Sequence, residues 1–218
     1  MSKIIAIMLL LCCGMMLFGC ADDNGRRKAE QQKTIVVTDS VGRKVELPYP
    51  LERVAVCNVY NAELITAVGA IDKIVGVDNY IFKDQSGFKN RFNEAQVFGI
   101  SQNAMNYEKL AELAPQAVII TGEGTWRDAQ EMLDRFGIKV IVINSYYTDQ
   151  FADNCRLIGR IFGREEQAEE LVNYFNDKLA YIQKQLQGVP RRSLYFEYRT
   201  LGKTAVPGDY FYKMVEYS

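Results

Sequence analysis

Histidine is absent from this sequence of 218 residues, and the absence excludes several kinds of site at once. Zinc or manganese capture sites built on histidine are excluded, because they need imidazole nitrogens as ligands. Ser-His-Asp and Cys-His catalytic systems are excluded as well, since histidine is their general base. We therefore expect no catalytic residue and no metal site in this chain, and we do not expect an enzyme.

The chain also lacks an excess of charge of either sign, with 26 Lys and Arg residues against 27 Asp and Glu residues. No basic block of the kind that binds nucleic acid is present, and there is no acidic tail. We therefore expect no nucleic-acid partner. The length suits one sizeable domain or two small ones.

The apolar run near the N-terminus is short. Residues 4–18 follow Lys3 and make an apolar run of about 15 residues, whereas a membrane-spanning helix needs about 20. The run is therefore typical of a signal peptide. It ends in Leu17-Phe18-Gly19-Cys20, which resembles the bacterial lipobox. We predict a signal peptide at 1–19, lipidation of Cys20 and a flexible polar linker over 20–33.

This reading predicts a location in the cell envelope, on the periplasmic side or the cell surface, with a lipid anchor in a membrane. An ordinary secretion signal with an unrelated cysteine is the alternative. Two further cysteines, Cys57 and Cys155, lie in the body of the chain. An exported protein can hold a disulfide, but their spacing does not indicate one. We favour two separate buried thiols, and their pairing stays open.

Strand-like and helix-like segments alternate between residues 53 and 162, which indicates a parallel sheet with right-handed crossovers. A hairpin with Gly42 in its turn precedes them. The continuous apolar run from Ala117 to Thr121 is typical of a strand covered on both faces. We predict a Rossmann-like α/β N-terminal lobe over 34–163. Its expected strands are 34–37, 44–47, 53–57, 73–77, 117–121 and 139–143, and its expected helices are 61–68, 107–113, 126–136 and 149–162.

A long amphipathic helix is predicted from Glu165 to Gln187, with Gly188 and Pro190 ending it. Its apolar residues fall on one stripe, at positions 168, 171, 172, 175, 179, 182 and 186. We predict a connecting helix over 164–190. A strand at 193–198 and a helix at 210–216 are expected after it, too little to enclose a core. We expect 191–218 to begin a second α/β lobe that is truncated here; packing of this segment on the first lobe is the alternative.

The order of these elements resembles the periplasmic solute-binding proteins of ABC importers, in the class that takes up iron-siderophores, haem and vitamin B12. The stretches that carry the resemblance are TIVVTDSVGR at 34–43, NAEL at 61–64 with IVGV at 74–77, and NYEKL at 106–110 with LAPQAVI at 113–119. The resemblance spans about 34–218. It implies two α/β lobes that face each other across a cleft and are joined by one rigid helix.

Ligands of open α/β sheets bind beyond the carboxyl ends of the strands, which selects the residues that follow each predicted strand. Tyrosine, tryptophan and asparagine offer flat apolar faces and hydrogen bonds there, and arginine offers a partner for a ligand carboxylate. This chemistry suits a chelate or macrocycle larger than a sugar. The predicted ligand-binding residues are Tyr60, Asn79, Tyr80, Trp126, Tyr146, Tyr147 and Arg199. The alternative is that they are ordinary loop polar residues and core aromatics.

Glu108 lies near the start of the helix predicted at 107–113. The resemblance implies that a glutamate at this place docks onto arginine residues of the permease, where a rim charge sets orientation and association rate more than affinity. The alternative is an interaction with the helix dipole alone. Gly122-Glu123-Gly124 lacks the third glycine of a nucleotide loop, so we expect it to serve a tight turn at the cleft.

The resemblance implies a lipid-anchored, monomeric binding component without a cofactor. It would capture a ferric siderophore, haem or a corrinoid and deliver it to an ABC permease and its ATPase. One alternative is a truncated binding lipoprotein that does not transport. Another is an exported α/β enzyme, against which the missing histidine argues.

Overall fold

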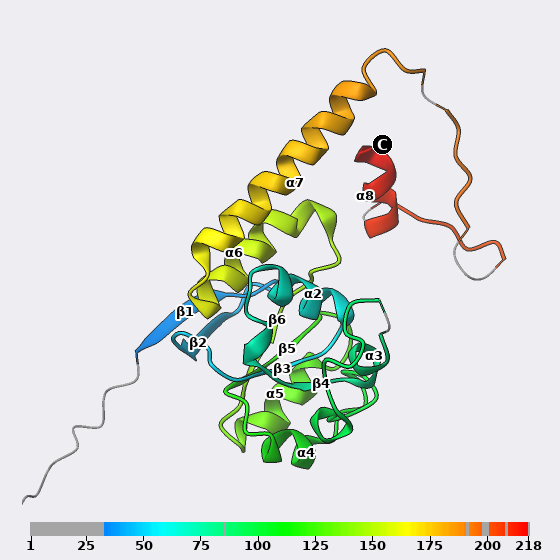
Figure 1. The fold of residues 1–218 in the computed structure, drawn as a ribbon. Helices are drawn as coiled ribbons and strands as arrows, with labels where there is room; N and C mark the ends of the chain where they lie inside the picture. The colour runs from blue at the N-terminus through cyan, green and yellow to red at the C-terminus, as the bar shows by residue number, and fades with distance from the viewer. Residues whose placement is uncertain (1–32, 85, 191, 198–200, 208, 218) are drawn as a thin grey trace, which may run out of the picture. The chain divides into compact units, whose positions relative to one another are not determined.

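The computed structural model describes residues 33–218 except 85, 191, 198–200, 208 and 218 (Figure 1). The predicted signal peptide, Cys20 and all of the predicted linker before Lys33 lie outside the described residues, as does Arg199. Within the described part of the chain, no helix has the length and apolar character needed to cross a membrane.

A two-stranded antiparallel hairpin opens the described chain, as the sequence predicts. Strands β1 (Thr34–Thr38) and β2 (Lys44–Pro48) pair with Thr34 opposite Pro48. The Asp39 carboxylate closes the turn by accepting the backbone N–H groups of Val41 and Arg43 at 3.2 and 2.9 Å. The hairpin loop also reaches the main sheet, because the Ser40 N–H donates to the carbonyl of Val142 at 2.9 Å.

The main sheet has four parallel strands, which confirms the predicted α/β class. They are β3 (Val54–Val56), β4 (Ile74–Val77), β5 (Ala117–Ile120) and β6 (Lys139–Val142), in the order β4-β3-β5-β6. The chain first adds a strand on one side of β3 and then adds two on the other side. The crossover direction therefore reverses between β3 and β5, the place where α/β sheets form a ligand crevice.

Alternate strand residues point to opposite faces, and each face has its own set of covering elements. Val54 and Val56 share one core with residues of the hairpin, α2 (Val59–Ala67), α6 (Phe151–Phe162) and α7 (Glu165–Gln185). Ala55 and Cys57 share the other core with residues of α4 (Tyr107–Glu112) and α5 (Trp126–Asp134). Figure 1 shows the sheet between these two layers. Both faces are covered, which explains the continuous apolar runs of the strands.

Short helical turns fill the connections. The sequence does not predict α3 (Asn79–Lys83) or the 3₁₀ turns at Ile71–Lys73, Glu94–Gln96 and Thr148–Gln150. Segments of three to five residues carry too little periodicity to be seen in a sequence. The helix α8 (Tyr210–Tyr217) confirms the helix expected near the end of the chain.

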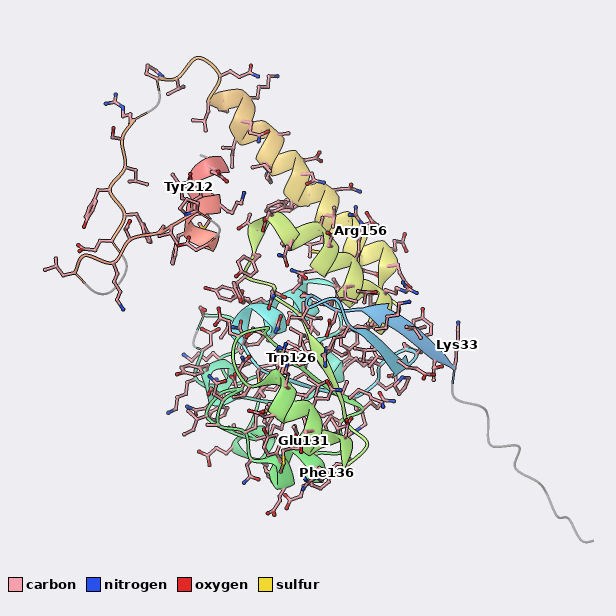
Figure 2. The ribbon with its side chains drawn as sticks, turned by 180° about the vertical axis from the view of Figure 1, so that it is seen from behind. Lys33, Trp126, Glu131, Phe136, Arg156 and Tyr212 are labelled. Atoms are coloured by element: carbon pink, nitrogen blue, oxygen red, sulfur yellow. The ribbon has the colours of Figure 1, made fainter. Side chains whose placement is uncertain are left out.

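Helix α7 matches the long helix predicted from its apolar stripe, but only its first half is covered. Ala168 and Val172 are buried against α6, and the Phe175 ring lies 4.3 Å from that of Phe151 between centroids. Ile182 and Leu186, at the far end of the same stripe, are exposed. Figure 2 shows Arg156 of α6 beside α7, where its guanidinium donates two hydrogen bonds to Glu169 at 2.6 and 3.1 Å.

The strand predicted at 193–198 is wrong. Residues 192–197 have no regular secondary structure, and Leu194 and Tyr195 are largely exposed. A strand needs a neighbouring strand to pair its backbone groups, and the described residues supply none beside this segment. The alternating apolar side chains of this segment therefore predict a strand that does not form among the described residues, because no neighbouring strand pairs with it.

Candidate functional site

Loops that follow the four parallel strands meet at the carboxyl edge of the sheet. Asn58, after β3, has a left-handed backbone with φ of 78° and caps α2, its side chain accepting the Tyr60 N–H at 2.9 Å. The Asn58 N–H donates to the carboxylate of Asp78, after β4, at 3.0 Å. Two neighbouring strands thus end in one hydrogen-bonded unit at the predicted crevice.

The Asp78 carboxylate links the ends of β3 and β4 through hydrogen bonds to backbone N–H groups. The side chain of Asp78 is buried and its other carboxylate oxygen accepts the Ile81 N–H at 2.9 Å, which caps α3. Burial raises the pKa of Asp78, and the backbone donors at Ile81 and Asn58 offset part of that rise. A buried carboxyl that is already bound to backbone groups serves the architecture of the edge rather than a ligand.

The loop after β5 is fixed by two amide side chains. Gln102 Oε1 accepts both the N–H and the hydroxyl of Thr121, at 2.9 and 2.8 Å, and its Nε2 donates to the Glu123 carbonyl at 2.5 Å. Asn144, after β6, accepts the Gly122 N–H at 2.7 Å. Gly124 has φ of +73°, a backbone conformation that favours glycine, and a Cβ there would lie 2.9 Å from Asn103 Oδ1.

Aromatic side chains follow β6. The rings of Tyr146 and Tyr147 lie 4.5 Å apart between centroids, tilted by 39°. The Tyr146 hydroxyl donates to Glu123 Oε1 at 3.1 Å, which links the loops after β5 and β6. Burial raises the pKa of Tyr146, and the carboxylate of Glu123 raises it further. Tyr146 is therefore a neutral hydrogen-bond donor at any physiological pH.

Two adjoining hollows open at this edge, with volumes of about 460 and 700 Å³. They share Asn58, Tyr60 and Glu123, and we call them together the carboxyl-edge hollow. Tyr146 and Tyr147 line the smaller part, and Tyr80 lines the larger part. The smaller part is also lined by residues from the end of the chain: Phe196, Lys203, Thr204, Ala205, Asp209 and Phe211. Four predicted ligand-binding residues are thus brought together: Tyr60, Tyr80, Tyr146 and Tyr147.

Trp126 lies elsewhere, which corrects the expectation that it contacts a ligand. Trp126 belongs to the core between the sheet and the helices α4 and α5, and it is 9% exposed. The guanidinium groups of Arg43 and Arg127 lie over its ring, 4.3 and 4.1 Å from the centroid. Figure 2 shows Trp126 and Glu131 on α5, and Phe136 just beyond the end of that helix. The Trp126 ring, which the sequence predicts as a ligand contact, is instead in contact with two guanidinium groups of the protein itself.

Asn79 also lies outside the carboxyl-edge hollow. It lines a separate hollow with Lys83, Phe98 and Lys109, and its N–H donates to the Gly99 carbonyl at 2.9 Å. The chain after β4 turns into helix α3 at Asn79, so the Asn79 side chain does not line the carboxyl-edge hollow. Only its neighbour Tyr80 faces the carboxyl-edge hollow.

Glu108 is exposed in the first turn of α4, whose N-terminus is capped by the Asn106 side chain. Its docking role stays a prediction. Cys57 and Cys155 are both buried free thiols. Burial raises the pKa of Cys57 and raises that of Cys155 to about 12, so both are protonated. The described residues contain no cluster of acidic or thiol side chains that could hold a metal ion.

Sequence reasoning missed several residues of the hollow. Ser101, Gln102 and Asn103 come from the long connection between α3 and α4, far along the chain from the strand ends they contact. Glu63 lines the hollow from α2, although its position at a helix start suggests only a structural role. An irregular loop has no periodicity, so its place in the hollow is set by tertiary contacts alone.

The sequence profile of the periplasmic binding protein family matches residues 54–213. The chain belongs to the periplasmic binding protein family. The match covers the parallel sheet, the carboxyl-edge hollow and helix α7, and such family membership implies a location in the periplasm or the cell envelope. No relative among curated protein sequences matches the chain.

Solved structures agree with this assignment. A periplasmic solute-binding protein from Veillonella parvula is 28% identical, with a TM-score of 0.59 over 72% of this chain and 50% of that one. SirA of Staphylococcus aureus, complexed with staphyloferrin B, is 20% identical, with a TM-score of 0.59 over 71% and 51%. The molybdate-binding protein MolA of Haemophilus influenzae is 21% identical, with a TM-score of 0.61 over 72% and 55%. The chain therefore spans about half the length of these relatives.

Proposed function

We propose that this periplasmic binding protein is the solute-capturing component of an ABC importer. It binds a ferric siderophore, haem or a corrinoid at the carboxyl-edge hollow and delivers it to the permease without chemical change. The observation that carries the proposal is the convergence of Tyr60, Tyr80, Tyr146 and Tyr147 on one hollow at the switch point of the sheet.

The chemistry of the hollow supports a flat or bulky ligand. Tyrosine rings supply contact area with a polar edge, and the backbone-anchored side chains of Asn58 and Gln102 hold the rim in one shape. A volume of several hundred Å³ is in the range of sites for small molecules. Staphyloferrin B and haem, named with two of the structural relatives, are ligands of this kind.

The test is a titration of the purified full chain with haemin, cyanocobalamin and a panel of ferric siderophores, followed by isothermal calorimetry. Saturable binding of one of them at a one-to-one ratio is the expected result. Tyr146→Ala and Tyr60→Ala weaken that binding, whereas Phe136→Ala, at an exposed position after the end of α5, leaves it unchanged. The absence of heat with every ligand would overturn the proposal.

Glu108 is the proposed contact for the permease. Its side chain is exposed in the first turn of α4, where a basic surface of a partner can contact it. With a reconstituted permease and ATPase, Glu108→Lys is expected to abolish the stimulation of ATP hydrolysis by this protein, while Glu112→Lys on the same helix has a smaller effect. Ligand affinity in solution stays the same in both variants.

Lipidation of Cys20 is the proposed tether. An anchor confines the binding protein to its membrane and raises its concentration beside the permease. Mass spectrometry of the mature protein tests this: a diacylglyceryl group on a new N-terminal Cys20 is expected, and Cys20→Ser releases the protein into the soluble fraction. A surface binder that does not transport would keep the anchor and fail the ATPase experiment.

A further inference from the structure

Acidic residues outnumber basic residues in the described lining of the carboxyl-edge hollow. The larger part is lined by three acidic residues, Glu63, Asp78 and Glu123, and its described lining contains no lysine or arginine. The smaller part adds Asp209 and Lys203. The described lining of the whole hollow therefore holds four acidic residues against one basic residue, in a chain whose overall charges nearly balance.

Glu123 is the acidic group best placed to meet a ligand. It belongs to both parts of the hollow and is exposed, unlike Asp78, which is buried and bound to backbone donors. The Tyr146 hydroxyl occupies Oε1 of Glu123, and this hydrogen bond orients the carboxylate from the wall of the hollow. Among the described residues, the second carboxylate oxygen of Glu123 accepts no side-chain hydrogen bond.

The tyrosine rings of the hollow also attract positively charged groups. The face of an aromatic ring carries partial negative charge and attracts cations, particularly organic ammonium groups. Tyr60 and Tyr80 are largely exposed beside Glu63, and Tyr146 and Tyr147 flank Glu123. Carboxylates and ring faces within one hollow reinforce each other, because low-dielectric walls focus the field of charges of one sign.

We infer that the carboxyl-edge hollow selects ligands that carry a positive charge over ligands of the same shape that carry a negative one. The inference rests on the proposed function and narrows its substrate class to cationic or amine-bearing chelates and macrocycles. It runs opposite to the sequence-based expectation that Arg199 pairs with a ligand carboxylate.

A matched series of ligands tests the inference. A ferric tris-hydroxamate with a free primary amine, the same chelate acetylated on that amine and the same chelate succinylated on it carry charges of about +1, 0 and −1 at neutral pH. Calorimetric titration of the full chain is expected to give affinities that fall in that order. Glu123→Gln is expected to weaken binding of the amine form about fivefold and to narrow the difference between the amine and succinyl forms.

Glu131→Gln is the control, because it removes the same charge from an exposed position on α5 outside the hollow. Its affinities should match those of the unaltered protein. Equal affinities across the series, a preference for the succinyl form, or binding of haemin or cyanocobalamin without any of the three chelates would overturn the inference and leave the proposed function standing. No binding of any chelate, haemin or cyanocobalamin would overturn the proposed function itself.

Discussion

The guanidinium group of Arg43 lies 4.3 Å from the centre of the Trp126 ring while it donates two hydrogen bonds to the buried carboxylate of Asp39, at 3.0 and 2.7 Å. One side chain thus joins the hairpin loop to the start of α5. It also donates to the Val140 carbonyl of the edge strand β6 at 3.1 Å. The Arg43 side chain thus contacts the hairpin loop, the edge strand of the sheet and the helix that follows the glycine turn at 122–124.

Removing Arg43 is expected to lower stability strongly. Arg43→Ala leaves the Asp39 carboxylate buried without its cation, and the expected loss is about 3 kcal/mol in the free energy of unfolding. Arg127→Ala is the matched control, because it removes the other guanidinium group that lies over the same ring; Arg127 is itself exposed, and the expected loss is below about 1 kcal/mol. Urea unfolding followed by circular dichroism measures both. Equal losses would contradict the role given to the Asp39–Arg43 pair.

Substitution of Trp126 is expected to change stability but not ligand affinity, whereas substitution of Tyr146 is expected to change mainly ligand affinity. Trp126→Phe removes buried volume from the core and should lower the free energy of unfolding by about 1–2 kcal/mol, with ligand affinity unchanged. Tyr146→Ala removes an aromatic wall of the hollow and should weaken ligand binding by about tenfold with a smaller loss of stability. Thermal unfolding and calorimetric titration of the two variants check this. A large loss of ligand affinity in Trp126→Phe would contradict the placement of Trp126 in the core and would indicate that it contacts the ligand.

Gly159 allows α6 and α7 to approach closely. A Cβ at this position would lie 2.5 Å from the Cβ of Ala168 and 2.9 Å from the carbonyl oxygen of Arg164. Gly159→Ala is therefore expected to destabilise the protein by about 1–3 kcal/mol, because helix packing must give way. The double variant Gly159→Ala/Ala168→Gly should recover part of that loss, as a double-mutant cycle would show. Additive losses would mean that positions 159 and 168 are not coupled and would contradict the close contact assigned to them.

Asp78 is expected to make stability fall as pH rises. Burial raises its pKa above the ordinary value of 3.8, so the folded state binds its proton more readily than the unfolded state. Such a group adds stability below pH 3.8 and loses that contribution as pH rises through the folded pKa. The difference in the free energy of unfolding between the unaltered protein and Asp78→Asn should therefore decrease from about pH 3.5 to about pH 6. An increase over that range would reverse the assigned direction of the pKa shift.

Much of the fold follows from local patterns in the sequence. The continuous apolar run at 117–121, the turn at Gly42 and the stripe that begins at Ala168 each depend on the spacing of a few neighbouring residues. Such spacing decides whether a segment is a strand, a turn or a helix. The rule that ligands bind beyond the carboxyl ends of parallel strands selected Tyr60, Tyr80, Tyr146 and Tyr147, which line the carboxyl-edge hollow.

Tertiary contacts decided the rest. Trp126 and Tyr146 both follow strands of the same sheet, but Arg43 from the hairpin covers the first and leaves the second to the hollow. Gln102 reaches the strand ends from an irregular loop, and residues 192–197 form no strand because the described chain gives them no partner. The sequence by itself determined the class of the sheet, its crevice and the residue types at its edge. Only the packing of segments far apart in the chain decided which of those side chains line the hollow, because burial and pairing depend on neighbours that local spacing does not specify.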